Sequence, residues 1–263
     1  MFMQSDLIDV KVTDCAGTII INRRDHGNRL TRLMLQQLGE ALDDLYLEKK
    51  VRAIILTGAG EVFCEGLDWQ EMKANEGEPL AQQRWGDDAA AWRDLVLRIL
   101  EITKPIIASV NGPALSAGAG LVLASDIVVA SHDAGFGLPD PRHGLVAGVA
   151  APLLCHRLGA GHAARLLLTS TTINAADAHR VGLFHDVVAP DKTWARAMEL
   201  AQQCAAGAPE ALQLTKRLLN ETVGEQLETQ LAAGAVMRAT SCTTEAAQEG
   251  LAAYAEQRPP EWR

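Results

Sequence analysis

The chain has 263 residues, 48% hydrophobic and 22% charged, so it is long and apolar enough to fold around a sizeable core. A net charge of −9 and a pI near 5.3 argue against a dedicated surface for nucleic acid or an anionic membrane. No apolar run reaches the roughly 20 residues that span a bilayer, and the first ten residues lack a signal-peptide pattern, which predicts a cytoplasmic protein. Five scattered cysteines without a C-x-x-C pair, and histidines without ligand spacing, predict reduced thiols and no metal.

The first hundred residues alternate between strand and helix patterns. Residues 7–12 and 17–22 are β-branched runs around a short turn and predict a hairpin. Residues 51–58 are nearly all apolar, as in a strand buried in a parallel sheet. Residues 71–88 are polar and predict a loop or short helix over a site, before a helix that ends near Leu100. Residues 30–50 predict a helix whose buried stripe contains Leu30, Leu33, Leu38, Leu42 and Leu45.

The pattern changes in the second half. Residues 105–110 and 126–131 predict two further strands, and residues 111–126 between them read as a glycine-rich turn that leads into a helix. From about residue 148 the chain becomes rich in Ala, Leu, Gln and Glu at helical spacing. We therefore expect an α/β protein with a βα core over residues 1–190 and a helical lobe over residues 191–263.

Two glycine-rich turns follow buried strands, one around Gly58, Gly60 and Gly66 and the other within residues 111–126. Backbone N–H groups at such a turn lack internal partners and can bind an anion. A dinucleotide fingerprint is a weak reading, because the third glycine falls at Phe63 or Leu123. Two readings remain open from the residues alone: paired N–H donors for an oxyanion, or glycines that only let strands and helices pack closely.

Four motifs agree in their order along the chain: FCEGLD, NGPALSAGAGLVLASD, FGLPDPRHGLVAG and EAAQEGLAAYAEQRPPEW. Together they resemble the crotonase superfamily (enoyl-CoA hydratase/isomerase family) from about residue 7 to 260. The resemblance implies a ClpP/crotonase-like spiral of ββα units, with the C-terminal helical lobe serving oligomerisation and covering the active site. It also implies a homotrimer or hexamer, an acyl-CoA thioester as substrate, and no cofactor, since coenzyme A is part of the substrate.

The resemblance assigns roles to individual residues. The backbone N–H groups of Leu67 and Ala117 correspond to the two oxyanion donors of the family, and alanine at residue 117 keeps the N–H. Asp68 is assigned to the substrate site, although an aspartate before a helix is more typical of a cap. Lys216 corresponds to a cation for the nucleotide phosphates, and its alternative is a solvated helix charge. The remaining expected substrate-binding residues are His26, Asn28, Cys64, Gly66 and Ser116.

The acids of the family are where this sequence departs from the pattern. Family hydratases use two glutamates, at positions that here are Gly120 and Asp140, and a third acid site of the superfamily falls at Gly148. Asp140 is therefore the one acid that remains. A double-bond shift needs a single base, which favours isomerase-like or altered hydratase chemistry. The alternatives are a non-catalytic acyl-CoA binding or regulatory protein, and an acyl-CoA hydrolase or C–C lyase on the same fold.

Other side chains near Asp140 have two readings each. His143 is a candidate helper for Asp140, or a loop histidine that only packs. Arg142 is expected to pair with Asp140, and Asp140 itself has a turn-forming alternative before Pro141. Three tryptophans are candidates for the acyl pocket or for the core, namely Trp69, Trp85 and Trp92.

Overall fold

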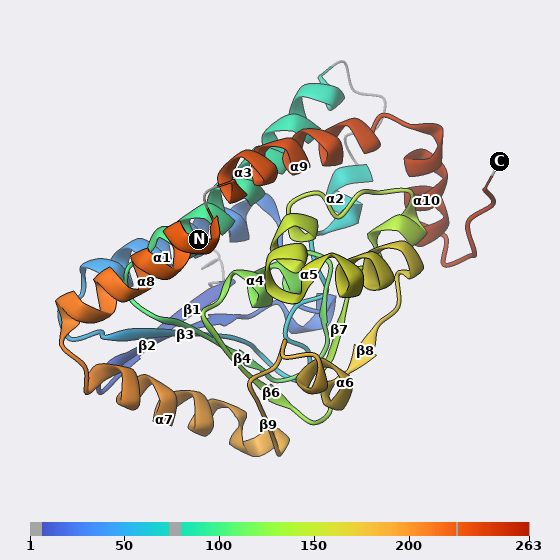
Figure 1. Cartoon of the computed structure of the whole chain (residues 1–263). Coiled ribbons are helices and arrows are strands. Elements are labelled where there is room, and N and C mark those ends of the chain that lie inside the picture. Colours follow the sequence, from blue (N-terminus) through green and yellow to red (C-terminus); the bar gives the residue numbers. More distant parts are fainter. Residues whose placement is uncertain (1–6, 74–79, 225, 263) are drawn as a thin grey trace, which may run out of the picture.

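The computed structural model describes residues 7–73, 80–224 and 226–262. Its larger sheet has six strands in the order β1-β2-β3-β4-β6-β9 (Figure 1). β1 (Ile8–Thr13) and β2 (Ala16–Ile21) form the predicted antiparallel hairpin, with Ile8 opposite Ile21. The other neighbouring strands are parallel: β3 (Ala53–Gly58), β4 (Ile106–Val110), β6 (Ile127–Ser131) and β9 (Asp186–Val188).

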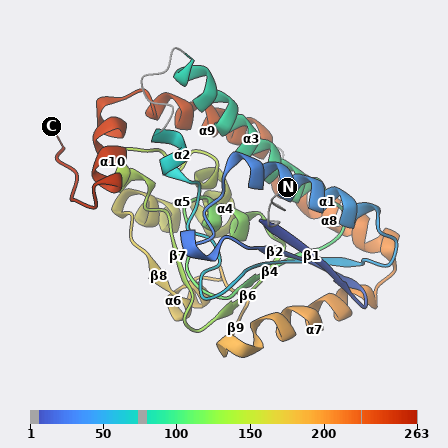
Figure 2. The same cartoon turned by 180° about the vertical axis from the view of Figure 1, so that it is seen from behind.

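Alternate residues of the central strands face two different hydrophobic clusters, as the period of two in a strand requires. Ile54 and Leu56 point into the main core, whereas Ile55 points to the opposite face of the sheet. That face is covered by α7 (Thr193–Ala205), which packs through Ala197 and Ala201 (Figures 1 and 2). The predicted division of the chain at about residue 190 stays a prediction.

The helix predicted over residues 30–50 is α1 (Arg32–Leu47), which begins after Thr31, whose hydroxyl accepts the N–H of Met34. Its buried face contains the expected Leu38, Leu42 and Leu45. Leu33 is 38% exposed, so the predicted stripe was wrong there. The buried face passes through Met34, and Leu33 lies about 100° away from it around the helix.

Two helices follow β3. The segment predicted as a loop or short helix contains most of α2 (Trp69–Lys73), but its end belongs to a long helix, α3 (Ala81–Glu101). α3 buries an apolar stripe that includes Trp85 and Trp92, and it ends where the sequence predicted. The part of that segment over residues 74–79 lies outside the described residues.

A second, three-stranded sheet lies beside the first and leads to the site. It consists of β5 (Ala114–Leu115), β7 (Gly135–Gly137) and β8 (Ile173–Asn174). β5 runs directly into α4 (Ala117–Ala124), every residue of which is buried, so the predicted turn and helix over residues 111–126 are confirmed.

The helical second half is also confirmed. α9 (Leu227–Ser241) packs against α3 and α5, two helices that lie far from α9 in the sequence (Figures 1 and 2). The other helices here are α5 (Ala150–Thr169), α6 (Ala175–Arg180), α8 (Pro209–Gly224) and α10 (Glu245–Ala255).

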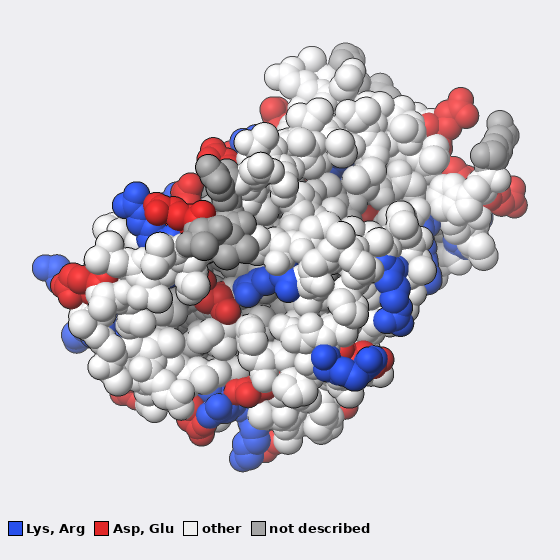
Figure 3. All heavy atoms as spheres, viewed as in Figure 1, with Lys and Arg blue, Asp and Glu red and all other residues white. Residues whose placement is uncertain are grey.

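The surface carries apolar side chains on its C-terminal helices. Figure 3 shows one face on which charged residues lie mainly toward the rim and uncharged ones cover most of the centre. The large exposed hydrophobic residues of α5, α8 and α9 are Leu168, Leu214, Leu218, Leu219, Val236 and Met237. The homotrimer or hexamer stays a prediction. Among the described residues, no helix has the length and apolar character needed to cross a membrane, and no group of three His, Cys, Asp or Glu side chains is placed to hold a metal.

Candidate active site

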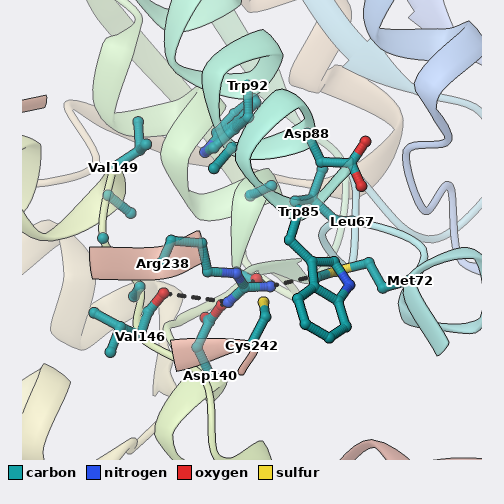
Figure 4. Close-up of a pocket in the computed structure, with 16 residues that line it drawn as sticks. Leu67, Met72, Trp85, Asp88, Trp92, Asp140, Val146, Val149, Arg238 and Cys242 are labelled. Atoms are coloured by element: carbon teal, nitrogen blue, oxygen red, sulfur yellow. Dashed lines mark hydrogen bonds and ion pairs between the residues drawn. The ribbon is translucent and has the colours of Figure 1, made fainter. Parts of the chain in front are cut away.

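A single pocket brings together residues from distant parts of the chain. The space between its lining atoms, counting the part open to solvent, is about 460 Å³. The side chains come from the turns before α2 and α4, from α3, from the loop after β7 and from α9 (Figure 4). Its lining residues are Leu67, Met72, Trp85, Asp88, Ala89, Trp92, Ser116, Ala117, Asp140, Val146, Ala147, Gly148, Val149, Ala150, Arg238 and Cys242.

The two predicted oxyanion donors belong to turns that touch each other. A Cβ added to Gly66, which has φ +114°, would lie 2.6 Å from Ser116 Cβ and 3.3 Å from Ala117 N. Ser116 takes the unusual backbone angles φ 50° and ψ −119°, and Ala117 is the first residue of α4. Within the described part of the chain, the N–H groups of Leu67 and Ala117 have no hydrogen-bond acceptor. Both residues line the pocket, so the turns offer two unpaired backbone donors to it.

Asp140 is buried at the start of a short 3-10 helix, η2 (Asp140–His143), and is only 3% exposed. Its Oδ1 accepts hydrogen bonds from Ser116 Oγ at 2.9 Å and from Arg238 Nη1 at 2.8 Å. Its Oδ2 is buried and has no hydrogen-bond partner among the described residues. The carboxylate is therefore fixed through one oxygen and leaves the other available. Asp140 does begin the turn of η2, as the turn-forming alternative has it, but the hydrogen bonds of its carboxylate go to Ser116 and Arg238.

The arginine that pairs with Asp140 is Arg238, not Arg142 (Figure 4). Arg142 is exposed and donates to the Thr169 carbonyl oxygen, so its predicted pairing was wrong. Sequence reasoning missed Arg238, although a signal was present. Leu231, Ala235 and Arg238 recur at helical spacing on the buried face of α9, and an arginine on such a face implies a buried partner.

The two other family acid positions have no room for a side chain. A Cβ at Gly120 would lie 2.6 Å from Cζ2 of Trp92, whose indole is packed there. A Cβ at Gly148 would overlap the carbonyl of Gly234 on α9. Neither glycine leaves empty space in the pocket wall. Each is the place where a neighbouring element makes contact.

A second carboxylate lines the pocket, and the sequence did not point to it. Asp88 of α3 is held by Arg32 in a two-pronged contact, with Nε to Oδ1 at 2.5 Å and Nη2 to Oδ2 at 2.7 Å. Both of its oxygens are thus engaged by a cation, unlike those of Asp140.

His143 packs in an aromatic cluster. Its ring lies 4.3 Å from that of Trp69 and 5.6 Å from that of Tyr254, centroid to centroid. Burial lowers the pKa of His143 below its usual 6.5, although the nearby Asp140 opposes this. Trp69 belongs to this cluster, whereas Trp85 and Trp92 line the pocket, so the pocket alternative holds for two of the three tryptophans.

Several residues assigned to the substrate are engaged in holding the turns. Asn28 is fully buried, and its Nδ2 donates to the carbonyl oxygens of Ala59 and Val62. Cys64 exchanges backbone hydrogen bonds with the strand before α4, and burial raises the pKa of its thiol to about 12. The carbonyl of Gly66 accepts the N–H of Leu30.

The remaining assigned residues differ in their exposure. His26 is exposed at the end of η1 (Arg24–His26). Asp68 accepts the N–H of Gln70 at 3.0 Å and so caps α2, as the alternative reading predicted. Lys216 is 6% exposed and pairs with Asp126 at 2.7 Å, so the solvated-charge alternative is wrong.

The fold and the pocket define an α/β protein in which Leu67 and Ala117, whose backbone N–H groups have no acceptor among the described residues, line the same pocket as the buried Asp140. A family model described as enoyl-CoA hydratase/isomerase matches residues 14–263, and the chain belongs to this family. The predicted family and its acyl-CoA-processing class are therefore confirmed.

Named relatives support the same family. The chain is 33% identical to a short-chain-enoyl-CoA hydratase of Clostridium acetobutylicum, covering 92% of each chain. It is 31% identical to a 2,3-dehydroadipyl-CoA hydratase of Escherichia coli, covering 93% of this chain and 94% of that one. It superposes on a crystal structure of an enoyl-CoA hydratase from Mycobacterium avium subsp. paratuberculosis with a TM-score of 0.86, at 25% identity and 98% coverage of both chains. The crotonase-like fold is thus confirmed.

Proposed function

We propose that this protein moves a proton on an enoyl-CoA thioester with Asp140 as its single acid–base group, in an isomerase-like double-bond shift. The observation that carries the proposal is the asymmetry of Asp140, with Oδ1 held by two donors and Oδ2 buried without a partner. Oδ2 would remove a proton from one carbon of the acyl chain and return it to another. Coenzyme A enters only as part of the substrate.

The negative charge that forms on the thioester oxygen needs donors that are already in place. The N–H groups of Leu67 and Ala117 fit this role, because they are unpaired and line the same pocket as Asp140. Polarisation of the thioester carbonyl by these donors should lower its infrared stretching frequency on binding. An unshifted band in the bound ester would remove the donor pair from the mechanism.

The pocket offers no second carboxylate in the state that a hydratase needs, among the described residues. The space beside Gly120 is occupied by Trp92, and the space beside Gly148 is occupied by the backbone of Gly234. Both carboxylate oxygens of Asp88 accept hydrogen bonds from Arg32. Addition of water uses groups that orient the water and move protons at two carbons. One available carboxylate oxygen therefore favours a proton shift over hydration.

The test is to incubate 2-enoyl and 3-enoyl thioesters with the enzyme in D₂O and follow the products by mass spectrometry. A shift through Oδ2 should exchange a carbon-bound proton for deuterium and leave the chain otherwise intact. Asp140→Asn should lower that exchange at least about a hundredfold while CoA-ester binding changes less than about twofold. A product heavier by one water would identify a hydratase, and binding without any conversion would identify a non-catalytic acyl-CoA binder.

One observation favours thioester hydrolysis as a second candidate. Ser116 stands at a strand–turn–helix junction with φ 50°, beside the Ala117 N–H, and its Oγ donates to Asp140. A serine in this setting would attack the thioester carbonyl while the carboxylate takes its proton and passes it to the leaving CoA thiolate. Water would then cleave the acyl-serine ester and release the free acid. Release of free thiol from saturated acyl-CoA would establish this activity, and its absence would exclude it.

A further inference from the structure

The guanidinium of Arg238 has one edge that its protein partners leave almost unused. Nη1 donates to Asp140 Oδ1 at 2.8 Å and to the Val146 carbonyl at 3.2 Å. Nη2 contacts the thioether sulfur of Met72 at 3.8 Å, and Nε is buried with no partner in the part of the chain that the structure describes. The fork formed by Nε and Nη2 therefore meets only a weak acceptor.

A second unpaired donor belongs to the same pocket. Trp85 is 7% exposed and lines the pocket together with Met72 and Arg238 (Figure 4), and its Nε1 is buried without a partner within residues 7–73, 80–224 and 226–262. Buried N–H groups in proteins are nearly always hydrogen-bonded, so unpaired ones in a pocket indicate an acceptor supplied by a ligand. Most of the other lining side chains are apolar, Leu67 and Trp92 among them.

The charges of the pocket decide what kind of acceptor fits. Arg238 is buried and paired with Asp140, and the half-exposed Arg32 is shared by Asp88 and Glu71, so a carboxylate bound beside Arg238 would have no further cation to balance it. A neutral oxygen needs no counter-charge, and its two lone pairs match a guanidinium fork.

We propose that the acyl pocket accepts a thioester whose acyl chain carries a neutral carbonyl oxygen, bound by Nε and Nη2 of Arg238 with Trp85 Nε1 as a further donor. The inference rests on the proposed function, because it takes the ligand to be an acyl-CoA thioester. The same guanidinium holds Asp140, so the carbonyl lies a few bonds beyond the carbon that faces Oδ2. Arg238 and Trp85 thereby become specificity-determining residues.

The experiment compares dissociation constants of three saturated thioesters, which have no double bond to move or hydrate. The probes are hexanoyl-CoA, its 5-oxo derivative and adipoyl-CoA, measured by titration calorimetry with the full chain. The 5-oxo ester should bind at least about tenfold more tightly than hexanoyl-CoA, as expected for a hydrogen bond to a charged group. Equal binding of the two would overturn the inference, and tighter binding of adipoyl-CoA would overturn the choice of a neutral oxygen.

Variants locate the effect. Arg238→Lys keeps a cation near Asp140 but removes the two donors Nε and Nη2. The ratio of the dissociation constants of hexanoyl-CoA and its 5-oxo derivative should therefore fall close to one, even if both esters bind more weakly. Trp85→Phe removes the Nε1 donor together with one ring of the indole. It should lower the same ratio, because the lost ring affects both esters and the lost donor affects only the 5-oxo ester. Arg142→Lys is the matched control, because Arg142 is exposed and does not line the pocket, and the ratio should stay as in the wild type. An unchanged ratio in both Arg238→Lys and Trp85→Phe would refute the assignment.

The result can be separated from a failure of the proposed function. If hexanoyl-CoA binds and enoyl thioesters exchange deuterium, but no ester is preferred, only this inference fails. If none of the three thioesters binds, the acyl-CoA site itself is absent, and both proposals fall.

Discussion

The contact between Gly120 and Trp92 gives a stability prediction that can be worked out from the structure. Gly120→Ala adds a Cβ 2.6 Å from Cζ2 and 3.4 Å from Cη2 of the indole, where Trp92 is only 4% exposed and has little room to move. Overpacking of a core costs about 1–3 kcal/mol, whereas replacing glycine in a helix gains up to about 1 kcal/mol. The net expectation is a loss of about 0–2 kcal/mol.

A double-mutant cycle isolates the contact from these opposing effects. Cζ2 and Cη2 belong to the outer ring of the indole, which Trp92→Phe removes. The double variant should therefore be more stable than the sum of the single effects by about 1–3 kcal/mol in urea unfolding. Gly39→Ala is the matched control, because Gly39 also lies within a helix and a Cβ there meets nothing within 4 Å. It should stabilise the protein by about 0.5–1 kcal/mol. Additivity within about 0.5 kcal/mol in the cycle would refute the steric account of Gly120.

Three further predictions concern other parts of the molecule. Ser116→Ala and Ser116→Gly should both lower turnover about tenfold, because each removes the hydroxyl that donates to Asp140. The glycine variant should be the more stable of the two, because glycine tolerates φ 50°. Unequal turnover would show that the backbone, not Oγ, matters. Burial lowers the pKa of His143 below 6.5, so its neutral form stabilises the fold above pH 6.5, and that contribution is lost as the pH falls. His143→Gln should flatten the fall of the urea midpoint below about pH 6.5, and an identical profile would contradict this. Lys216→Met removes the cation that pairs with Asp126 and should lower the free energy of unfolding by up to about 3 kcal/mol. The affinity for acyl-CoA should stay unchanged. A weaker affinity would support the alternative role, in which Lys216 binds the nucleotide phosphates.

The fold was predictable where the signal is local. β3 reads as a continuous apolar run because a parallel strand covered on both faces has no polar side, and all six of its residues are buried. The error at Leu33 shows the limit of such patterns. The spacing of the leucines predicts an apolar stripe, but the face of α1 that becomes buried depends on the elements that pack against it. In the structure Met34, and not Leu33, lies on that buried face.

The site was predictable only in part, because its side chains meet through packing between distant elements. Motif positions gave Asp140, Leu67 and Ala117, all of which line one pocket. They could not give Arg238 and Asp88, since those lie on long helices with no motif and reach the pocket only through the packing of α3 against α9. The glycines at residues 120 and 148 read as missing acids, but their contacts with Trp92 and Gly234 exist only in the folded chain.

The pairing of Asp140 with Arg238 also bears on why one acid can suffice. An arginine keeps its charge throughout a reaction, so the pair is neutral at rest, with one anion and one cation. When Oδ2 takes a proton from the thioester in the proposed reaction, the negative charge moves to the enolate oxygen while Arg238 stays positive. The buried pocket would therefore hold the same net charge before and after the transfer, with the charge of Arg238 balanced throughout. A second ionised glutamate at residue 120 would add a negative charge beside that enolate, and Trp92 in its place keeps this part of the wall uncharged.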